Sequence, residues 1–126
     1  MRQFGELEAV IMDRLWQRAR PALVREVLDD LRKERPLAYT TVMTVMENLH
    51  HKGWLRRHRD GRAWRYEPAG SRSAYTAALM SNALATSTDR RTALAHFALQ
   101  MSPHDAALLQ QALDQAHPRL EEGGTR

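Results

Sequence analysis

Residues 39–67 read YTTVMTVMENLHHKGWLRRHRDGRAWRYE, and this stretch is the most informative about the architecture of the chain. Apolar side chains in its first part recur at the three- and four-residue spacing of a helix, and Gly53 is typical of a helix end. After Gly53, two six-residue runs rich in arginine and aromatic residues flank Asp60-Gly61, a dipeptide typical of a tight hairpin turn. We therefore expect a helix over residues 39–52 and a hairpin with strands at 54–59 and 62–67.

Two more helices are expected ahead of this stretch. Apolar residues between positions 7 and 15 follow a helical period that Pro21 ends, and those between 24 and 31 repeat the stripe up to Pro36. Three short helices with tight connections, followed by a hairpin, are typical of a winged helix-turn-helix. The expected fold class is therefore mainly α with a small β-hairpin, with a winged-helix DNA-binding domain over residues 1–69.

The part after residue 69 is expected to be helical and to pair with a second copy of the chain. Asp89 and the run Ser102-Pro103 are typical helix starts. Three short helices whose apolar residues are mostly alanine and leucine bury little surface, because segments under ~60 residues have a small core. A helical dimerisation domain is therefore expected over residues 70–118, followed by a flexible tail at 119–126. The residues expected in the dimer interface are Leu79, Leu84, Leu94, Phe97, Met101, Leu109 and Leu113.

The positive charge of the chain is concentrated in one short segment. Residues 52–65 contain six basic side chains and one acid, Asp60, for a net charge of +5, whereas the whole chain carries +4. We expect that these cations cannot be neutralised within the segment. A basic hairpin that follows a helix is typical of a protein that binds the DNA backbone. Trp64 and Tyr66 are expected to pack on the helices from one face of the hairpin, and the arginines to project outward.

The face of the 39–52 helix opposite the core is expected to read DNA. Val42, Val45, Met46 and Leu49 fall on one side of a helical wheel, and the threonines gather on the other. Threonine hydroxyls and methyls suit hydrogen bonds and thymine contacts in a major groove. Glu47 is expected either to accept a hydrogen bond from a cytosine amino group or to pair with a neighbouring arginine.

The residues expected to contact DNA come from this helix and from the hairpin. The arginines are expected to supply affinity through phosphates, and Thr40, Met43, Thr44 and Asn48 to supply sequence discrimination. The full set is Tyr39, Thr40, Thr41, Met43, Thr44, Asn48, His51, Lys52, Arg57, Arg59, Arg62 and Arg65.

The sequence contains no motif of an enzyme, a metal protein or a membrane protein. It has no cysteine, no His-Glu-x-x-His, no phosphate-binding glycine loop and no nucleophile elbow, and its six histidines are not spaced as ligands on one helix face. No apolar run approaches the ~20 residues that span a bilayer, and the N-terminus lacks the pattern of a signal peptide. We therefore expect no catalysis, no metal, no cofactor, no membrane insertion and a cytoplasmic location.

Four segments together resemble one family of bacterial repressors. They read GELEAVIMDRLW (5–16), VREVLDDL (24–31), AYTTVMTVMENLHHKGWLRR (38–57) and RDGRAWRYEP (59–68). The set resembles the BlaI/MecI/CopY family, also called penicillinase repressors, closely over residues 5–68 and more loosely over 71–117. The resemblance implies a homodimer that binds a pseudo-palindromic operator in double-stranded DNA and represses nearby genes. It also implies a membrane metalloprotease sensor that triggers cleavage of the repressor within its C-terminal helices.

The chain departs from this family at several positions. Many relatives have arginine where this chain has Asn48, and many have a capping serine where it has Ala38. Phe97 follows His96, so the Asn-Phe pair at which well-known members are cleaved is absent. The cysteine-rich C-terminus of the copper-responsive branch is absent too, which excludes thiolate copper sensing.

Two alternatives to an operator-binding repressor stay open. The first is a winged-helix module that binds protein or RNA, since basic wings occur in such modules as well. The second is a ligand-sensing repressor of the multidrug-resistance type, in which Trp54, Trp64 and Phe97 would line an effector pocket. Gel filtration and a protected dyad in DNA would separate these alternatives.

Overall fold

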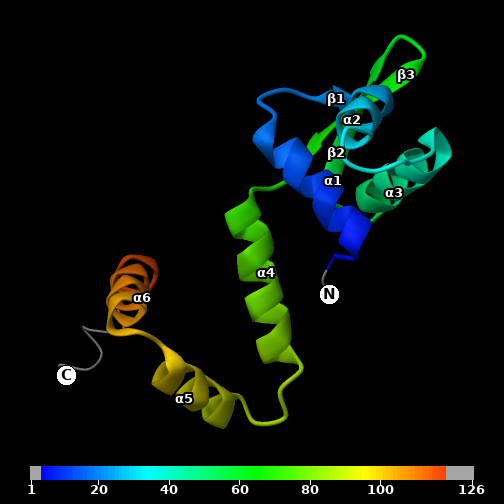
Figure 1. The fold of residues 1–126 in the computed structure, drawn as a ribbon. Helices are drawn as coiled ribbons and strands as arrows, with labels where there is room; N and C mark the ends of the chain where they lie inside the picture. The colour runs from blue at the N-terminus through cyan, green and yellow to red at the C-terminus, as the bar shows by residue number, and fades with distance from the viewer. Residues whose placement is uncertain (1–3, 119–126) are drawn as a thin grey trace. The chain divides into compact units, whose positions relative to one another are not determined.

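The structure is a computed structural model that describes residues 4–118 (Figure 1). It divides into two compact units, one ending at Ser81 and one beginning at Asn82, so that the division falls inside a helix. The elements in chain order are α1 (Glu6–Gln17), β1 (Ala22–Leu23), α2 (Val24–Leu31), α3 (Tyr39–His51), β2 (Leu55–Asp60), β3 (Ala63–Pro68), α4 (Arg72–Ala85), α5 (Arg90–Gln100) and α6 (Pro103–Ala116).

The first unit packs three helices beside a small antiparallel sheet whose strand order is β1-β3-β2. The expected hairpin is present, but its turn is one residue later than expected: Asp60 pairs with Ala63, and Gly61 and Arg62 form the loop. Gly61 has a φ of +66°, and no residue other than glycine among those described has a positive φ. A two-residue turn with glycine only at its first loop position matches type II′ rather than the type I′ turn typical of Asp-Gly. The strands are accordingly shifted by one residue.

The short strand β1 was not expected from the sequence. Its two residues pair with β3, Ala22 with Tyr66 and Leu23 with Arg65. Two residues are too few to produce a recognisable alternating pattern. The consequence is that the wing is a three-stranded sheet, with β3 in the middle and β2 at one edge.

The hydrophobic core of the first unit lies between the helices and the base of the wing. The expected core residues Val42, Met46 and Leu49 of α3 are fully buried, whereas Val45 is only half-buried. The other buried core residues are Ile11, Met12, Leu15, Ala22, Val24, Val27, Leu28, Leu31, Leu55 and Tyr66. This core fixes the orientation of α3, since one side of the helix is completely covered.

The end of α3 connects directly to the wing through a glycine. Gly53 has a φ of +88°, which L side chains rarely adopt. The Trp54 N–H donates to the Leu49 carbonyl at 3.0 Å, and the Gly53 N–H donates to the His50 carbonyl at 3.0 Å. This pair of bonds is a Schellman motif, which ends the helix and turns the chain sharply. The expectation that Gly53 terminates this helix is confirmed.

An aromatic cluster holds the first turns of α4 against the winged-helix unit. The Phe4 and Tyr75 rings stack with centroids 4.0 Å apart, and the Phe4 N–H donates to the Tyr75 hydroxyl at 2.8 Å. Trp16 and Trp54 also contact Tyr75, and the Trp16 Nε1–H donates to the Gly70 carbonyl at 2.9 Å. These contacts explain why the first compact unit extends to Ser81. The expected boundary of independent domains at residues 69 and 70 stays a prediction.

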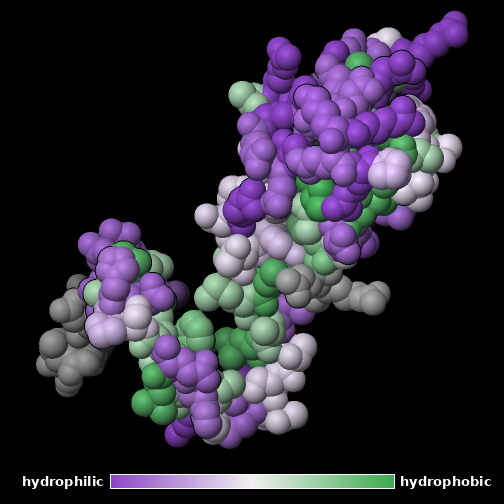
Figure 2. All heavy atoms as spheres, in the orientation of Figure 1, coloured by the Kyte–Doolittle hydropathy of each residue, from purple (hydrophilic) through white to green (hydrophobic). Residues whose placement is uncertain are grey.

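The second unit consists of capped helices with little core of its own. Asp89 accepts from the Thr92 N–H at the start of α5, and Ser102 accepts from the Asp105 N–H at the start of α6, as the capping patterns predict. Neither α5 nor the described part of the chain that follows it contains a buried residue. Figure 2 shows hydrophobic side chains on the surface of this unit. Among the described residues, no helix is both long and apolar enough to cross a membrane.

Candidate nucleic-acid interface

The exposed side of α3 carries the small polar side chains that the sequence predicts for it. Thr40, Thr41, Thr44, Asn48 and His51 are all exposed. The helix begins after Ala38, which makes no side-chain cap, so the first backbone N–H groups lack a side-chain partner there. This edge offers hydroxyl, amide and imidazole groups to a partner. That these groups contact DNA stays a prediction.

Three cations of the 52–65 segment are already paired with carboxylates. Lys52 Nζ lies 2.7 Å from a Glu8 oxygen and Arg56 Nη2 lies 3.3 Å from a Glu67 oxygen. Arg65 contacts two acids, Asp60 at 2.6 Å and Glu26 at 3.3 Å. The hydrogen bond that Arg65 donates to Asp60 is the largest cause that raises the pKa of Arg65 above its ordinary value, and the charges of Asp60 and then Glu26 add to it.

The expectation that these cations cannot be neutralised within the segment holds, but acids outside the segment pair with three of the six. Of the paired acids only Asp60 belongs to the segment; Glu8 and Glu26 come from α1 and α2, and Glu67 from β3. The sequence could not reveal the pairs with Glu8 and Glu26, because these depend on how separate elements pack. Arg65, expected to contact DNA, is half-buried and held by two carboxylates.

The other three arginines, Arg57, Arg59 and Arg62, have no carboxylate partner among residues 4–118. Two of them do not simply project outward, contrary to expectation. The guanidinium carbons of Arg57 and Arg59 lie 4.3 and 4.5 Å from the centroid of the Trp64 ring. Arg57 also donates to the Tyr66 hydroxyl at 3.3 Å, and Arg59 donates to the Arg62 carbonyl at 3.3 Å. Arg62 itself is exposed in the turn.

The pairing register explains this arrangement. Arg57 pairs with Tyr66 and Arg59 with Trp64, and side chains of paired residues lie on the same face of a sheet. The aromatic residues and these two arginines therefore share one face. Tyr66 at the base is buried and Trp64 nearer the tip is half-buried, so the tryptophan remains available to the arginines.

A groove of about 490 Å³ separates α3 from this face of the wing. Its charged lining is Arg25, Glu47, Arg57 and Arg62, and its apolar lining includes Met43 and Trp64. Met43, expected to be on the exposed face, is half-buried here. Glu47 is half-buried too, and within the described part of the chain it forms no ion pair, so its expected pairing with an arginine is not observed.

Sequence reasoning did not find Arg25. It lies in the first turn of α2 and reaches the same groove as α3 and the wing. The sequence pattern predicted the helix that contains Arg25 only as part of the core, so it did not indicate that Arg25 lines the groove. The groove thus brings together cationic side chains from α2, β2 and the turn.

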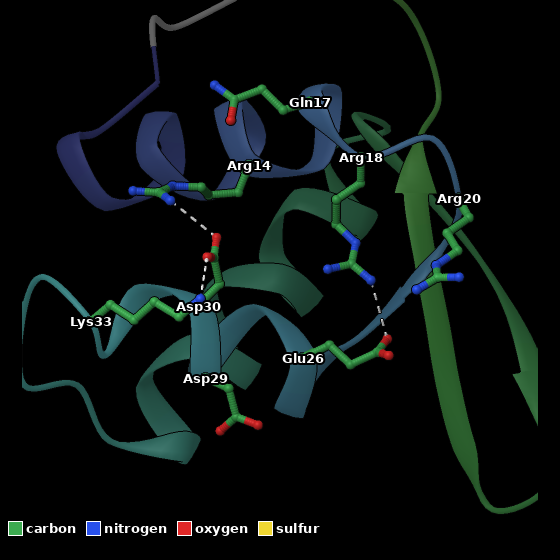
Figure 3. Close-up of a pocket in the computed structure, with 8 residues that line it drawn as sticks. All are labelled: Arg14, Gln17, Arg18, Arg20, Glu26, Asp29, Asp30 and Lys33. Carbon is green, nitrogen blue, oxygen red and sulfur yellow. Dashed lines mark hydrogen bonds and ion pairs between the residues drawn. The ribbon is translucent and has the colours of Figure 1, made fainter.

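A second hollow, between α1 and α2, is lined almost entirely by charged residues (Figure 3). Arg14 lies 3.1 Å from Asp30, and Arg18 lies 3.6 Å from Glu26 (Figure 3). These opposite charges pair with each other, so the hollow is a set of ion pairs between helices rather than a site for an anion. Arg14 has a raised pKa, chiefly because Glu34 accepts a hydrogen bond from it.

Glu26 connects this hollow to the wing. Its carboxylate accepts from the Leu23 N–H at 2.8 Å at the start of α2, and it also pairs with Arg18 and Arg65. The Leu23 hydrogen bond is the largest cause that lowers the pKa of Glu26, and the charges of Arg18 and Arg65 add to it. Glu26 therefore ties α1, α2 and β3 together, a role that the sequence pattern did not indicate.

The residues expected in the dimer interface lie mostly at the surface of the single chain. Leu79, Leu84 and Met101 are half-buried. Leu94 is 49% exposed and Phe97 44% exposed, and Leu109 and Leu113 are also exposed. These exposed leucine and phenylalanine side chains are available to a partner. That the partner is a second copy of the chain stays a prediction.

The geometry of the first unit gives little support to the alternative of a ligand-sensing repressor with an effector pocket. Trp54 lies in the aromatic cluster with Phe4 and Tyr75, whereas Trp64 lies in the groove beside α3, so these two tryptophans do not line a common pocket. Within residues 4–118, no group of three or more histidine or acidic side chains is placed to hold a metal ion.

The family model and the curated relatives point to the same family. The sequence model described as penicillinase repressor matches residues 4–115. Two proteins named transcriptional regulator BlaI, from Mycobacterium tuberculosis strains CDC 1551 / Oshkosh and ATCC 25618 / H37Rv, are each 43% identical to the chain over 114 residues, which cover 88% of this chain and 83% of theirs. The solution structure of the DNA binding domain of the repressor BlaI is 29% identical, with a TM-score of 0.52; the match covers 58% of this chain and 88% of that one.

Proposed function

Because the chain belongs to the penicillinase repressor family, a family of transcriptional repressors and not of enzymes, we propose that it acts as a homodimer on a pseudo-palindromic operator. The chain is a DNA-binding transcriptional regulator with a winged-helix domain. The finer parts of the proposal are the residues that contact DNA, the dimer, and the way in which the repressor is released.

One observation supports the proposed contact residues above all others. Three exposed polar residues of α3 directly follow Tyr39, Met43 and Glu47 in the chain, and these three line a groove together with Arg57 and Arg62, which have no carboxylate partner among the described residues. A helix in the major groove would present Thr40, Thr44 and Asn48 to base edges. The wing would then lie over the neighbouring backbone, where unpaired guanidiniums bind phosphates well.

The proposed dimer is supported by the apolar surface of the second unit. Leu94 and Phe97 of α5 and Leu108 and Leu109 of α6 are between 40% and 51% exposed. Exposed apolar patches of this kind mark protein–protein contacts in soluble proteins. A symmetric dimer would place two copies of α3 at half-sites about one helical turn apart, roughly 10 base pairs from centre to centre.

The proposed location is the cytoplasm, where the DNA of a bacterium is found. Release from the operator through a membrane metalloprotease sensor is proposed only from the family resemblance. The Asn-Phe pair of well-known members is absent, and His96 and Phe97 of this chain are both exposed. Cleavage between His96 and Phe97 is therefore a separate question from DNA binding, and an effector ligand remains the other possible means of release.

The experiment that tests the proposal is selection of bound duplexes from random DNA, followed by sedimentation of the complex. We expect the selected sequences to contain a dyad and the complex to contain two chains. A single half-site bound by one chain would contradict the dimer, and the absence of any selected duplex would favour a protein- or RNA-binding module.

A pair of variants in α5 tests the link between dimer and operator. Leu94→Asp should weaken binding to the selected duplex by about 100-fold or more, because monomers lose the effective concentration that links two half-sites. Leu99 is on the same helix, but the helical spacing places it on the side away from Leu94 and Phe97, so Leu99→Asp is the matched control. Equal losses in both variants would show that charge on α5, rather than dimerisation, determines the affinity.

A further inference from the structure

Trp64 is the one wing residue of the described chain whose ring contacts two guanidiniums. Arg59 is its direct pairing partner across the hairpin, and Arg57 is the diagonal neighbour. The two guanidinium carbons lie 4.3 Å and 4.5 Å from the ring centroid, within the range of a cation–π interaction. The ring is half-buried and lines the groove beside α3.

Two hydrogen bonds complete the restraint of these arginines. Arg57 donates to the Tyr66 hydroxyl and Arg59 donates to the Arg62 carbonyl, both at 3.3 Å. Neither acceptor carries a charge. Arg57 and Arg59 are therefore held in place without being neutralised, in contrast to Arg56, whose partner is the Glu67 carboxylate at 3.3 Å.

Restraint without neutralisation matters for binding a phosphate. A free arginine side chain loses much rotamer freedom when it binds, which weakens the interaction. A cation–π contact uses the face of the guanidinium, whereas its five N–H donors lie in the plane of the group, so that most of them stay available. An arginine held over an indole thus loses less freedom on binding, and it keeps its charge and most of its donors.

We propose that Trp64 is a positioning residue of the wing, which holds Arg57 and Arg59 in the conformation that binds DNA phosphates. The inference rests on the proposed function and specifies how the wing achieves its affinity. Trp64 acts through the two arginines and does not itself need to touch DNA. Removing its ring should then weaken binding only while the arginines are present.

A double-mutant cycle tests this inference. The probe is a fluorescein-labelled duplex that carries the sequence selected by the wild-type chain, and affinity is measured by anisotropy at low salt. Trp64→Leu should weaken binding by about 5- to 30-fold, because Arg57 and Arg59 then lose their side-chain freedom only on binding. In an Arg57→Gln/Arg59→Gln background the same change should cost less than about twofold, because the coupled residues are already gone.

Trp64→Phe supplies the conservative variant. It retains an aromatic face, so its loss in the wild-type background should be clearly smaller than that of Trp64→Leu. Urea unfolding of each variant separates positioning from stability; if Trp64→Leu does not fold, the cycle is run with Trp64→Phe, whose smaller loss should likewise vanish in the double-glutamine background.

Two results would overturn the inference. Equal losses from the Trp64 change in both backgrounds would show that the indole touches DNA directly or only supports the fold. Equal affinities of Trp64→Leu and wild type would show that the arginines need no ring. Failure of the proposed function looks different, because the wild-type chain itself would then bind no selected duplex and both proposals would fall together.

Discussion

Pairs of cations in the wing region offer a direct test of which charges serve DNA binding. Arg59→Gln/Arg62→Gln removes two exposed cations that have no carboxylate partner within residues 4–118. Lys52→Gln/Arg56→Gln removes two exposed cations that pair with Glu8 and Glu67. Both double variants lower the net charge by two, so a general effect of charge would be the same in each.

The expected difference follows from counterion release. Each phosphate that a cation neutralises adds about 0.9 to the slope of log affinity against log salt. Losing Arg59 and Arg62 should therefore reduce the slope by about 1.8 per wing. For each wing, the loss of affinity between about 50 and 200 mM salt should then be roughly tenfold smaller in the variant than in the wild type. Lys52 and Arg56 must exchange a carboxylate for a phosphate, so their loss should change the slope by much less.

The assay is a series of anisotropy titrations on the selected duplex at four or five salt concentrations. Urea unfolding of both double variants serves as the folding control. Equal reductions in slope for the two variants would refute the reasoning, and would mean that DNA readily withdraws Lys52 and Arg56 from their acids.

Three further predictions concern the scaffold. Tyr75→Phe removes the hydroxyl that accepts from the Phe4 N–H and should destabilise the first unit by about 0.5–1.5 kcal/mol in urea unfolding; an unchanged midpoint would mean that this bond contributes nothing. Gly61→Ala should cost about 1 kcal/mol, because Gly61 has a φ of +66°, while Arg62→Ala in the same turn should cost much less; equal costs would contradict the assigned turn. The pKa of Glu26 is lowered by folding, so its contribution to stability is present above the ordinary glutamate pKa and is lost as the pH falls through the lowered value. Glu26→Gln should therefore flatten the acid limb of a melting-temperature profile, and parallel profiles would count against the assignment.

The helices of the first unit could be predicted because their signals are local. The expected helix over residues 39–52 is observed at Tyr39–His51, and Gly53 ends it in the conformation that its sequence pattern indicates. The caps Asp89 and Ser102 likewise accept the hydrogen bonds that such residues usually accept. The family resemblance and the winged-helix fold, both expected from the sequence, are confirmed by the family match and by the BlaI DNA-binding domain structure.

The face of the wing could have been predicted correctly as well. In the expected register and in the observed one, odd-numbered residues of β2 pair with even-numbered residues of β3. Arg57 and Arg59 thus share a face with Trp64 and Tyr66 in either case. The error came from separating aromatic and basic residues along one strand without considering the strand opposite.

The charge balance of the wing could not have been predicted in the same way. Glu8 and Glu26 are 44 and 39 residues away from their partners Lys52 and Arg65. Their contacts exist only because α1 packs against α3 and α2 packs beside the sheet. The net charge of one segment can be counted from the sequence. The charge of a binding surface cannot, because it depends on which charges the fold leaves unpaired.

The absence of any buried residue in α5 and in the described α6 has a consequence for the living cell. If these helices gain their apolar contacts from a second copy, their stability follows mass action and increases with the number of molecules present. A scarce repressor would leave this half of each chain open to housekeeping proteases, and an abundant one would protect it. Copy number would then set the lifetime of the protein as well as its occupancy of DNA.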